Sequence, residues 1–150
     1  RNIILIDGDL EIELNEINKL TEKFESYDFQ CAIVGIRWSK LYFNNLNLFD
    51  IGNYIINIFF NVLFNSKMND ILCCLKIIPK NLIYELNLTS RGFSIETEIM
   101  SKLMLNKVIV KEIMINYNRR TKQQGKKIKY SDGLGILLTM LKFRFFYNHK

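Results

Sequence analysis

The sequence predicts an α/β domain in which helices flank a parallel sheet. An apolar strand, an amphipathic helix and a second apolar strand follow one another within the first 37 residues. Hydrophobic residues make up 49% of the chain, and 150 residues suffice for one domain with a buried core. A single proline and seven glycines argue against a linker-rich or disordered protein.

The first three elements form a β-α-β unit. NIILI at residues 2–6 is typical of a strand, and apolar residues recur at helical spacing from Glu13 to about Ser26. QCAIVGIR then forms a second buried strand that ends at Arg37. The short connection predicts parallel strands, and ligands bind at the carboxyl ends of such strands. Both Asp7–Glu11 and Arg37 fall there.

Later segments predict four further helices and two further strands. Residues 51–66 form an amphipathic helix with an asparagine stripe (Asn53, Asn57 and Asn61), because residues four apart share one helical face. LCCLKII is typical of a strand, and Pro79 marks the start of a helix over KNLIYELN. SIETEIMSKLML predicts a helix and KVIVKEIMINYN a strand. A basic loop at 118–130 precedes an amphipathic C-terminal helix at 131–148.

Charge is unevenly distributed along the chain. Residues 1–105 carry ten Lys and Arg against 13 Asp and Glu, a net of −3, whereas residues 106–150 carry 11 against two, a net of +9. The two parts therefore face different electrostatic environments. The three cysteines have neither zinc spacing nor an even count, which predicts reduced core residues. Residues 51–66 form the longest uncharged stretch, too short to span a bilayer.

Four carboxylates follow the first strand at alternate positions: Asp7, Asp9, Glu11 and Glu13. In an extended stretch they project from one face and repel one another, which a divalent cation would relieve. Asp-Gly-Asp after a strand is also common in tight turns, so both interpretations stay open. An EF-hand is excluded, because its loop needs glycine where Ile12 stands.

Five segments resemble a known family. In chain order they are IDGDLEIELNEI, VGIRW, MNDILCCLKI, RGFSIETEIM and INYNRRTKQQGKKIKYSDGLGILLTMLKFRF. Together they resemble glycosyltransferase family 2, in the branch of dolichyl- or polyprenyl-phosphate sugar synthases. The positions that match its motifs are Asp7, Asp9, Glu11, Arg37, Asp70, Cys74, Lys76, Gly92, Phe93, Glu96, Glu98, Arg120, Thr121, Gly125, Lys126, Asp132 and Gly133.

The resemblance implies the C-terminal portion of a GT-A catalytic domain, a mixed, mostly parallel sheet flanked by helices, with the nucleotide-base-binding portion upstream. It implies inverting transfer of a sugar from a nucleotide-diphosphate sugar to a polyprenyl phosphate, with Mg²⁺ or Mn²⁺. Asp9 would be the main metal ligand, with Glu11 second and Asp7 beside them. Asp7, Asp9 and Arg37 would bind the donor, and Arg120 and Lys126 the acceptor phosphate.

The acceptor decides whether a catalytic base is needed. A phosphomonoester is largely ionised at pH 7 and attacks without one, whereas a sugar hydroxyl would need Asp70 or Glu98 as the base. Glu96 and Glu98 lie two apart and cannot share a helical face, and Glu98 is the one expected to point into the site.

The basic loop predicts an anionic partner. Six cations and no acid lie between Arg119 and Lys129. Nucleic acid and a phosphorylated lipid at a membrane surface both suit it, but the carboxylates and the net −3 of residues 1–105 favour the lipid. We therefore expect peripheral contact with the cytoplasmic face of a membrane and no nucleic acid. The alternatives are a family 2 transferase with a hydroxyl acceptor and a non-catalytic basic interaction module.

Overall fold

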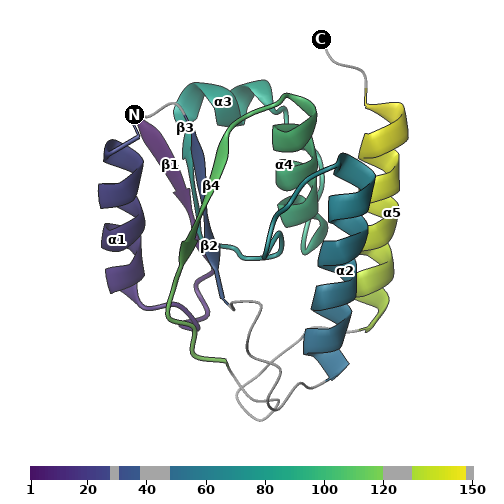
Figure 1. Cartoon of the computed structure of the whole chain (residues 1–150), viewed down its shortest axis with the longest axis horizontal. Coiled ribbons are helices and arrows are strands. Elements are labelled where there is room, and N and C mark those ends of the chain that lie inside the picture. Colours follow the sequence, from purple (N-terminus) through teal and green to yellow (C-terminus); the bar gives the residue numbers. More distant parts are fainter. Residues whose placement is uncertain (28–30, 38–47, 120–129, 148–150) are drawn as a thin grey trace.

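The computed structural model describes residues 1–27, 31–37, 48–119 and 130–147 (Figure 1). It is an α/β structure with a mixed four-stranded sheet flanked by helices. The strands are β1 (Asn2–Leu5), β2 (Ala32–Ile36), β3 (Lys76–Pro79) and β4 (Val110–Met114). The helices are α1 (Leu14–Glu25), α2 (Leu48–Phe64), α3 (Lys80–Glu85), α4 (Ser94–Leu105) and α5 (Tyr130–Phe146).

The sheet has the order β1-β3-β2-β4. β3 pairs antiparallel with both β1 and β2, while β2 and β4 are parallel. β1, β2 and β4 therefore run in the same direction, but β3 separates β1 from β2. The first β-α-β unit has two strands of the same direction, as predicted, but they are not neighbours. The expectation of a mostly parallel sheet is wrong, because two of the three strand pairs are antiparallel. β3 also starts at Lys76, later than the predicted strand over residues 72–78.

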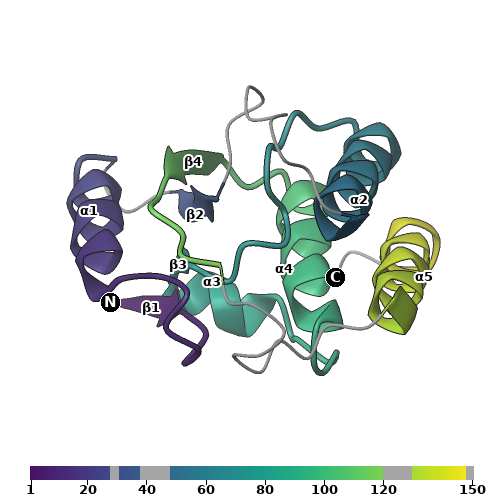
Figure 2. The ribbon, with the colours of Figure 1, turned by 90° about the horizontal axis from the view of Figure 1, so that it is seen from below.

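The helices form layers on both sides of the sheet. α1 covers one face, and α4 lies on the other, with α2 and α5 packed side by side beyond it (Figure 2). The core between the sheet and these helices includes Phe24, Ile33, Phe60, Ile77 and Met100. Burial of such apolar surface is the main stabilising contribution to the fold.

The asparagine stripe of α2 holds the segment that leads into β3. Asn57 Nδ2 and Asn61 Nδ2 donate to the Met68 carbonyl at 2.6 and 2.8 Å, and Ile71 N donates to Asn57 Oδ1 at 3.1 Å. The predicted polar side of this helix is confirmed. It faces the protein, because the backbone groups of residues 68–71 need partners when buried.

Gly35 allows β2 to pack closely against its neighbours. A Cβ at this position would lie 2.9 Å from Ile115 Cδ1 and 3.1 Å from Cys73 Sγ. A larger residue would push apart the strand end that positions Arg37.

Candidate functional site

The predicted donor-site residues lie at one edge of the sheet. β1, β2 and β4 all end at this edge, the lower one in Figure 1, and β3 begins there. Asp7–Glu11 follow β1, Arg37 follows β2, and Tyr117 follows β4. The carboxylates and Arg37 therefore lie at a common edge, as the sequence predicts.

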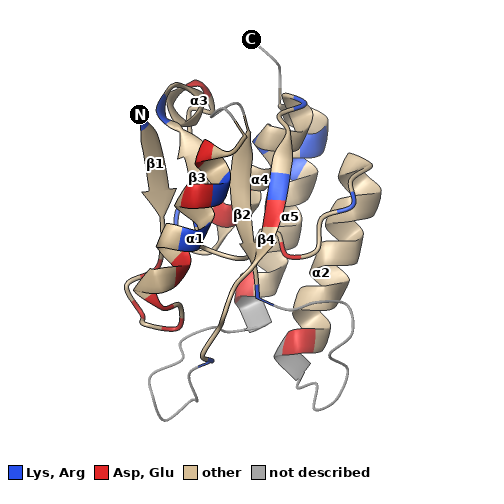
Figure 3. Ribbon diagram, turned by 60° about the vertical axis from the view of Figure 1, so that its left-hand side comes forward, with Lys and Arg blue, Asp and Glu red and all other residues tan. Residues whose placement is uncertain are grey.

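The carboxylates lie in a turn, and not on one face of a strand. β1 ends at Leu5, and Asp9 Oδ1 accepts a hydrogen bond from Glu11 N at 3.1 Å within the turn. Leu10 has a φ of +62°, a backbone conformation that is rare for leucine. Its side chain is 87% exposed. The expectation that alternate carboxylates project together is wrong here, because this side-chain-to-backbone bond bends the chain. Acidic residues nevertheless gather in this region (Figure 3).

Tyr117 connects the carboxylate turn to Arg37. Its hydroxyl donates to Glu11 Oε2, and the Arg37 guanidinium carbon lies 5.4 Å from the centre of its ring. Burial raises the pKa of Tyr117 to about 12, and the hydrogen bond to Glu11 acts in the same direction. The hydroxyl is therefore protonated at neutral pH and serves as a donor.

Asp70 holds Arg37 in a buried ion pair. Arg37 Nε and Nη2 each donate to one carboxylate oxygen at 2.8 Å, and Arg37 N donates at 3.1 Å. Burial opposes the charge of Arg37, but Asp70 outweighs it and raises the pKa of the guanidinium. Both oxygens of Asp70 are thus engaged by a cation, and the geometry does not support its predicted role as a base. Glu112 fixes Asn69, the residue before Asp70, by accepting a hydrogen bond from Asn69 N at 2.7 Å.

Glu98 forms its hydrogen bonds away from this edge of the sheet. Its carboxylate is fully buried and accepts from Thr89 N, Ser90 N and Lys102 Nζ at 3.0, 2.6 and 2.5 Å. Burial raises its pKa, but these hydrogen bonds outweigh that effect and lower it. Glu98 therefore holds the segment before α4, and the geometry does not favour it over Glu96 as a site residue.

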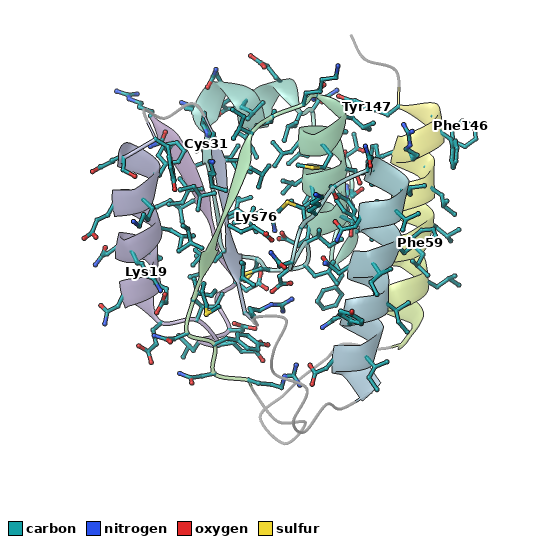
Figure 4. The ribbon with its side chains drawn as sticks, viewed as in Figure 1. Lys19, Cys31, Phe59, Lys76, Phe146 and Tyr147 are labelled. Carbon is teal, nitrogen blue, oxygen red and sulfur yellow. The ribbon has the colours of Figure 1, made fainter. Side chains whose placement is uncertain are left out.

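Glu96, on the other hand, faces a cavity beside Asp7. The cavity has a volume of about 190 Å³, and its polar lining residues are Asp7, Cys74 and Glu96. Glu96 pairs with Lys76, which is fully buried between the sheet and α4 (Figure 4). Burial raises the pKa of Glu96, and Lys76 offsets this only in part. The spacing of the two glutamates shows that they diverge, but cannot tell which one faces the cavity.

Two of the three cysteines behave as core residues. Cys31 and Cys73 are buried and Cys74 is half-buried. Burial raises the pKa of Cys73 to about 12 and that of Cys74 to about 11, so both thiols are protonated at neutral pH. Cys31 and Cys73 are core residues, as expected, whereas Cys74 lines the cavity beside Asp7 and Glu96.

The carboxylate turn is where the resemblance places a divalent cation. Within the described residues, no three or more His, Cys, Asp or Glu side chains are grouped for a metal. Mg²⁺, however, is commonly held by one or two carboxylates together with water and phosphate oxygens. Asp7 and Asp9 supply such ligands, and Glu11 lies in the same turn. No family model, curated protein or solved structure matches this chain.

The predicted acceptor site lies outside the described residues. Residues 120–129 of the basic loop are not described by the structure. They include Arg120 and Lys126, which are assigned to the acceptor phosphate, and Gly125. Arg119, just before it, forms a two-pronged ion pair with Asp50 in the first turn of α2. This ion pair joins the described start of the basic loop to α2.

Proposed function

We propose that this chain belongs to a GT-A glycosyltransferase that transfers a sugar from a nucleotide-diphosphate sugar to a polyprenyl phosphate, with inversion. The observation that carries the proposal is the meeting of the Asp7–Glu11 turn, Tyr117 and Arg37 at one edge of the sheet. The motif resemblance supports the same reaction.

The donor would bind across this edge. Asp9, with Glu11 or Asp7 as the resemblance implies, would hold Mg²⁺ or Mn²⁺, which when bound neutralises charge on the leaving nucleoside diphosphate. Arg37 contributes a fixed positive charge beside the turn, because Asp70 keeps its guanidinium ionised and in place. The carboxylates would thus position the cation, and Arg37 would attract the diphosphate.

The state of the predicted bases favours a phosphate acceptor. Asp70 pairs with the partly buried Arg37 and Glu98 with the buried Lys102, and neither is placed to take a proton from a sugar hydroxyl. A lipid phosphate needs no such base, because it is already ionised at pH 7. The alternative with a hydroxyl acceptor would need another base, and Glu96 on the cavity wall is itself paired with the buried Lys76.

Exposed apolar rows on two neighbouring helices support contact with a membrane surface. α2 exposes Ile51, Tyr54, Ile55, Ile58 and Val62, and α5 exposes Leu134, Leu138, Phe145 and Phe146. Figure 4 shows Phe146 pointing away from the molecule. Lys142 and Arg144 near the end of α5 would face anionic headgroups. Among the described residues, no helix combines the length and apolar character of a membrane span.

Membrane contact predicts a loss of vesicle binding when these rows are charged. The double variant Ile55→Glu, Leu138→Glu should weaken binding to anionic phospholipid vesicles by about tenfold or more, because two apolar side chains no longer enter the lipid. Co-sedimentation measures the effect. Ile109→Glu is the control, since Ile109 is 61% exposed but lies just before β4. Equal binding by the double variant and the control would contradict the assigned surface.

The acceptor assignment predicts a selective defect at Arg120. Arg120→Ala should weaken use of polyprenyl phosphate by about 1.5 to 3 kcal/mol, the contribution of a hydrogen bond to a charged group, and leave donor binding almost unchanged. Titrations of nucleotide sugar and polyprenyl phosphate with the full-length enzyme measure both effects. Arg120→Lys should recover only part of the loss, because lysine lacks the planar fork.

Three results would decide against this assignment. Equal weakening of both ligands would mean that Arg120 does not act on the acceptor. Transfer to a sugar hydroxyl, with none to polyprenyl phosphate, would favour the alternative family 2 reaction. Absence of both transfer and metal binding would favour a non-catalytic basic module.

A further inference from the structure

The cavity beside Asp7 combines an aliphatic surface with two carboxylates. It has a volume of about 190 Å³, and its polar lining residues are Asp7, Cys74 and Glu96. The apolar side chains that line it come from the end of β1, from α3 and the segment after it, and from α4: Leu5, Ile6, Ile83, Leu88, Ile95 and Ile99. A ligand that fills this space must therefore be both apolar and hydrogen-bonding.

The volume of the cavity suits a six-membered ring. A protein cavity of about 150 Å³ is large enough to bind benzene. A volume of about 190 Å³ leaves room for a saturated ring with small substituents. The aliphatic side chains would contact the C–H groups of such a ring, whereas carboxylate oxygens need hydrogen-bond donors. A ring that carries hydroxyl groups meets both requirements.

A buried lysine fixes Glu96 at the wall of this cavity. Lys76 on β3 is fully buried, and its ammonium group donates to Glu96 Oε2 and to the Cys73 carbonyl (Figure 4). The Glu96 side chain is 16% exposed, and within the described part of the chain no hydrogen bond reaches its Oε1. Glu96 therefore keeps one oxygen with which it can accept a hydrogen bond from a ligand.

The charges around the cavity disfavour an anionic ligand. Asp7 and Glu96 both line it, and Lys76 neutralises only one of these two charges. Arg37 also acts on Glu96 electrostatically, but its guanidinium is bonded to Asp70. A carboxylate or phosphate in the cavity would be repelled, whereas a hydroxyl group would donate to the same oxygens.

We propose that this cavity receives the sugar ring of the donor, and that Glu96, positioned by Lys76, restricts the donor to sugars without a negative charge. This inference rests on the proposed function, which supplies the sugar, and it requires no metal ion. Asp7 and Glu96 would accept from the hydroxyl groups of the ring. The isoprenoid part of the acceptor fits less well, because it has no donor for the two carboxylates that it would cover.

Filling the cavity tests where the sugar binds. Leu88→Trp places a larger side chain on the cavity wall. Calorimetric titrations of the full-length protein use uridine diphosphate glucose, guanosine diphosphate mannose and the two nucleoside diphosphates alone. Leu88→Trp should weaken binding of the nucleotide sugar by about tenfold or more and leave binding of the nucleoside diphosphate unchanged, because only the sugar enters the cavity. Ile109→Trp is the control, since Ile109 is 61% exposed just before β4.

Acidic sugars test the role of Glu96. Uridine diphosphate glucose and glucuronate differ only in a hydroxymethyl or carboxylate group, as do guanosine diphosphate mannose and mannuronate. In the pair that binds to the wild-type protein, the neutral sugar should bind about tenfold or more tightly than the acid. Glu96→Gln should reduce this preference, because it removes a negative charge and leaves the Lys76 ammonium without its counter-charge. Thermal unfolding of each variant checks that the fold persists.

The outcomes separate this inference from the proposed function. If the wild-type protein binds none of these nucleotides or nucleotide sugars, the proposed function fails, and this inference fails with it. If a nucleotide sugar binds and Leu88→Trp weakens it no more than Ile109→Trp does, only the sugar site is overturned. Weaker binding of polyprenyl phosphate alone in Leu88→Trp would assign the cavity to the acceptor. Equal wild-type affinity for the neutral and acidic sugars would overturn the role of Glu96.

Discussion

Asp9→Asn is expected to abolish metal-dependent binding of the nucleotide sugar and to leave the fold intact. The substitution removes the charge that a hard cation requires. It keeps Oδ1, the atom that accepts from Glu11 N at 3.1 Å, so the turn should persist. Calorimetric titration of the full-length protein with nucleotide sugar, with and without Mn²⁺, measures the loss. Thermal stability should be unchanged or slightly higher, because one charge leaves a repelling group of carboxylates.

Glu22→Gln is the matched control for Asp9→Asn. It removes one negative charge from an exposed position on α1 and should leave donor binding unchanged. If Asp9→Asn retained normal Mn²⁺-dependent turnover, the carboxylate segment would be a tight turn without a metal role, the interpretation that the sequence alone leaves open.

Asp70→Asn is expected to lower the free energy of unfolding by about 3 to 5 kcal/mol, the usual cost of leaving one buried charge without its partner. Asp70 is 2% exposed and receives three hydrogen bonds from Arg37. The substitution removes the buried carboxylate charge that faces the partly buried guanidinium. Chemical denaturation of wild type and variant measures the difference in free energy of unfolding, provided that both show the same dependence of this free energy on denaturant concentration.

Asp50→Asn provides a comparison of the same type at a more accessible ion pair. The side chains of Arg119 and Asp50 are 28% and 15% exposed, so this substitution should cost less, about 1 kcal/mol or below. The double variant Arg37→Met, Asp70→Leu should recover part of the stability, because it removes both charges. It should still fail to bind the donor. Loss of turnover in Asp70→Asn without loss of stability would instead favour the role of Asp70 as a base.

Local patterns in the sequence predicted most of the elements. The α4 helix occupies the predicted residues 94–105, and α3 begins directly after Pro79. β1, α1 and β2 each lie within one or two residues of their predicted limits. These elements depend on periodicity over 4 to 12 neighbouring residues, which is present in the sequence itself.

Pairing between distant segments could not be predicted in the same way. The insertion of β3 between β1 and β2 depends on which apolar strands fit together, and the periodicity of each strand is the same for either arrangement. The late start of β3 has a related cause. Residues 72–75 are apolar enough for a strand, but the segment before them is held by Asn57 and Asn61 of α2.

The sequence by itself determined which residue types end the strands, and hence that Asp7–Glu11 and Arg37 lie at one edge of the sheet. Only the tertiary structure decided what each side chain contacts. It paired Asp70 with Arg37, turned Glu98 toward the segment before α4 and Glu96 toward the cavity, and brought Tyr117 to Glu11. The physical reason is that charges and hydrogen-bonding groups, once buried, must find partners among whatever residues folding brings near, regardless of their separation in the sequence.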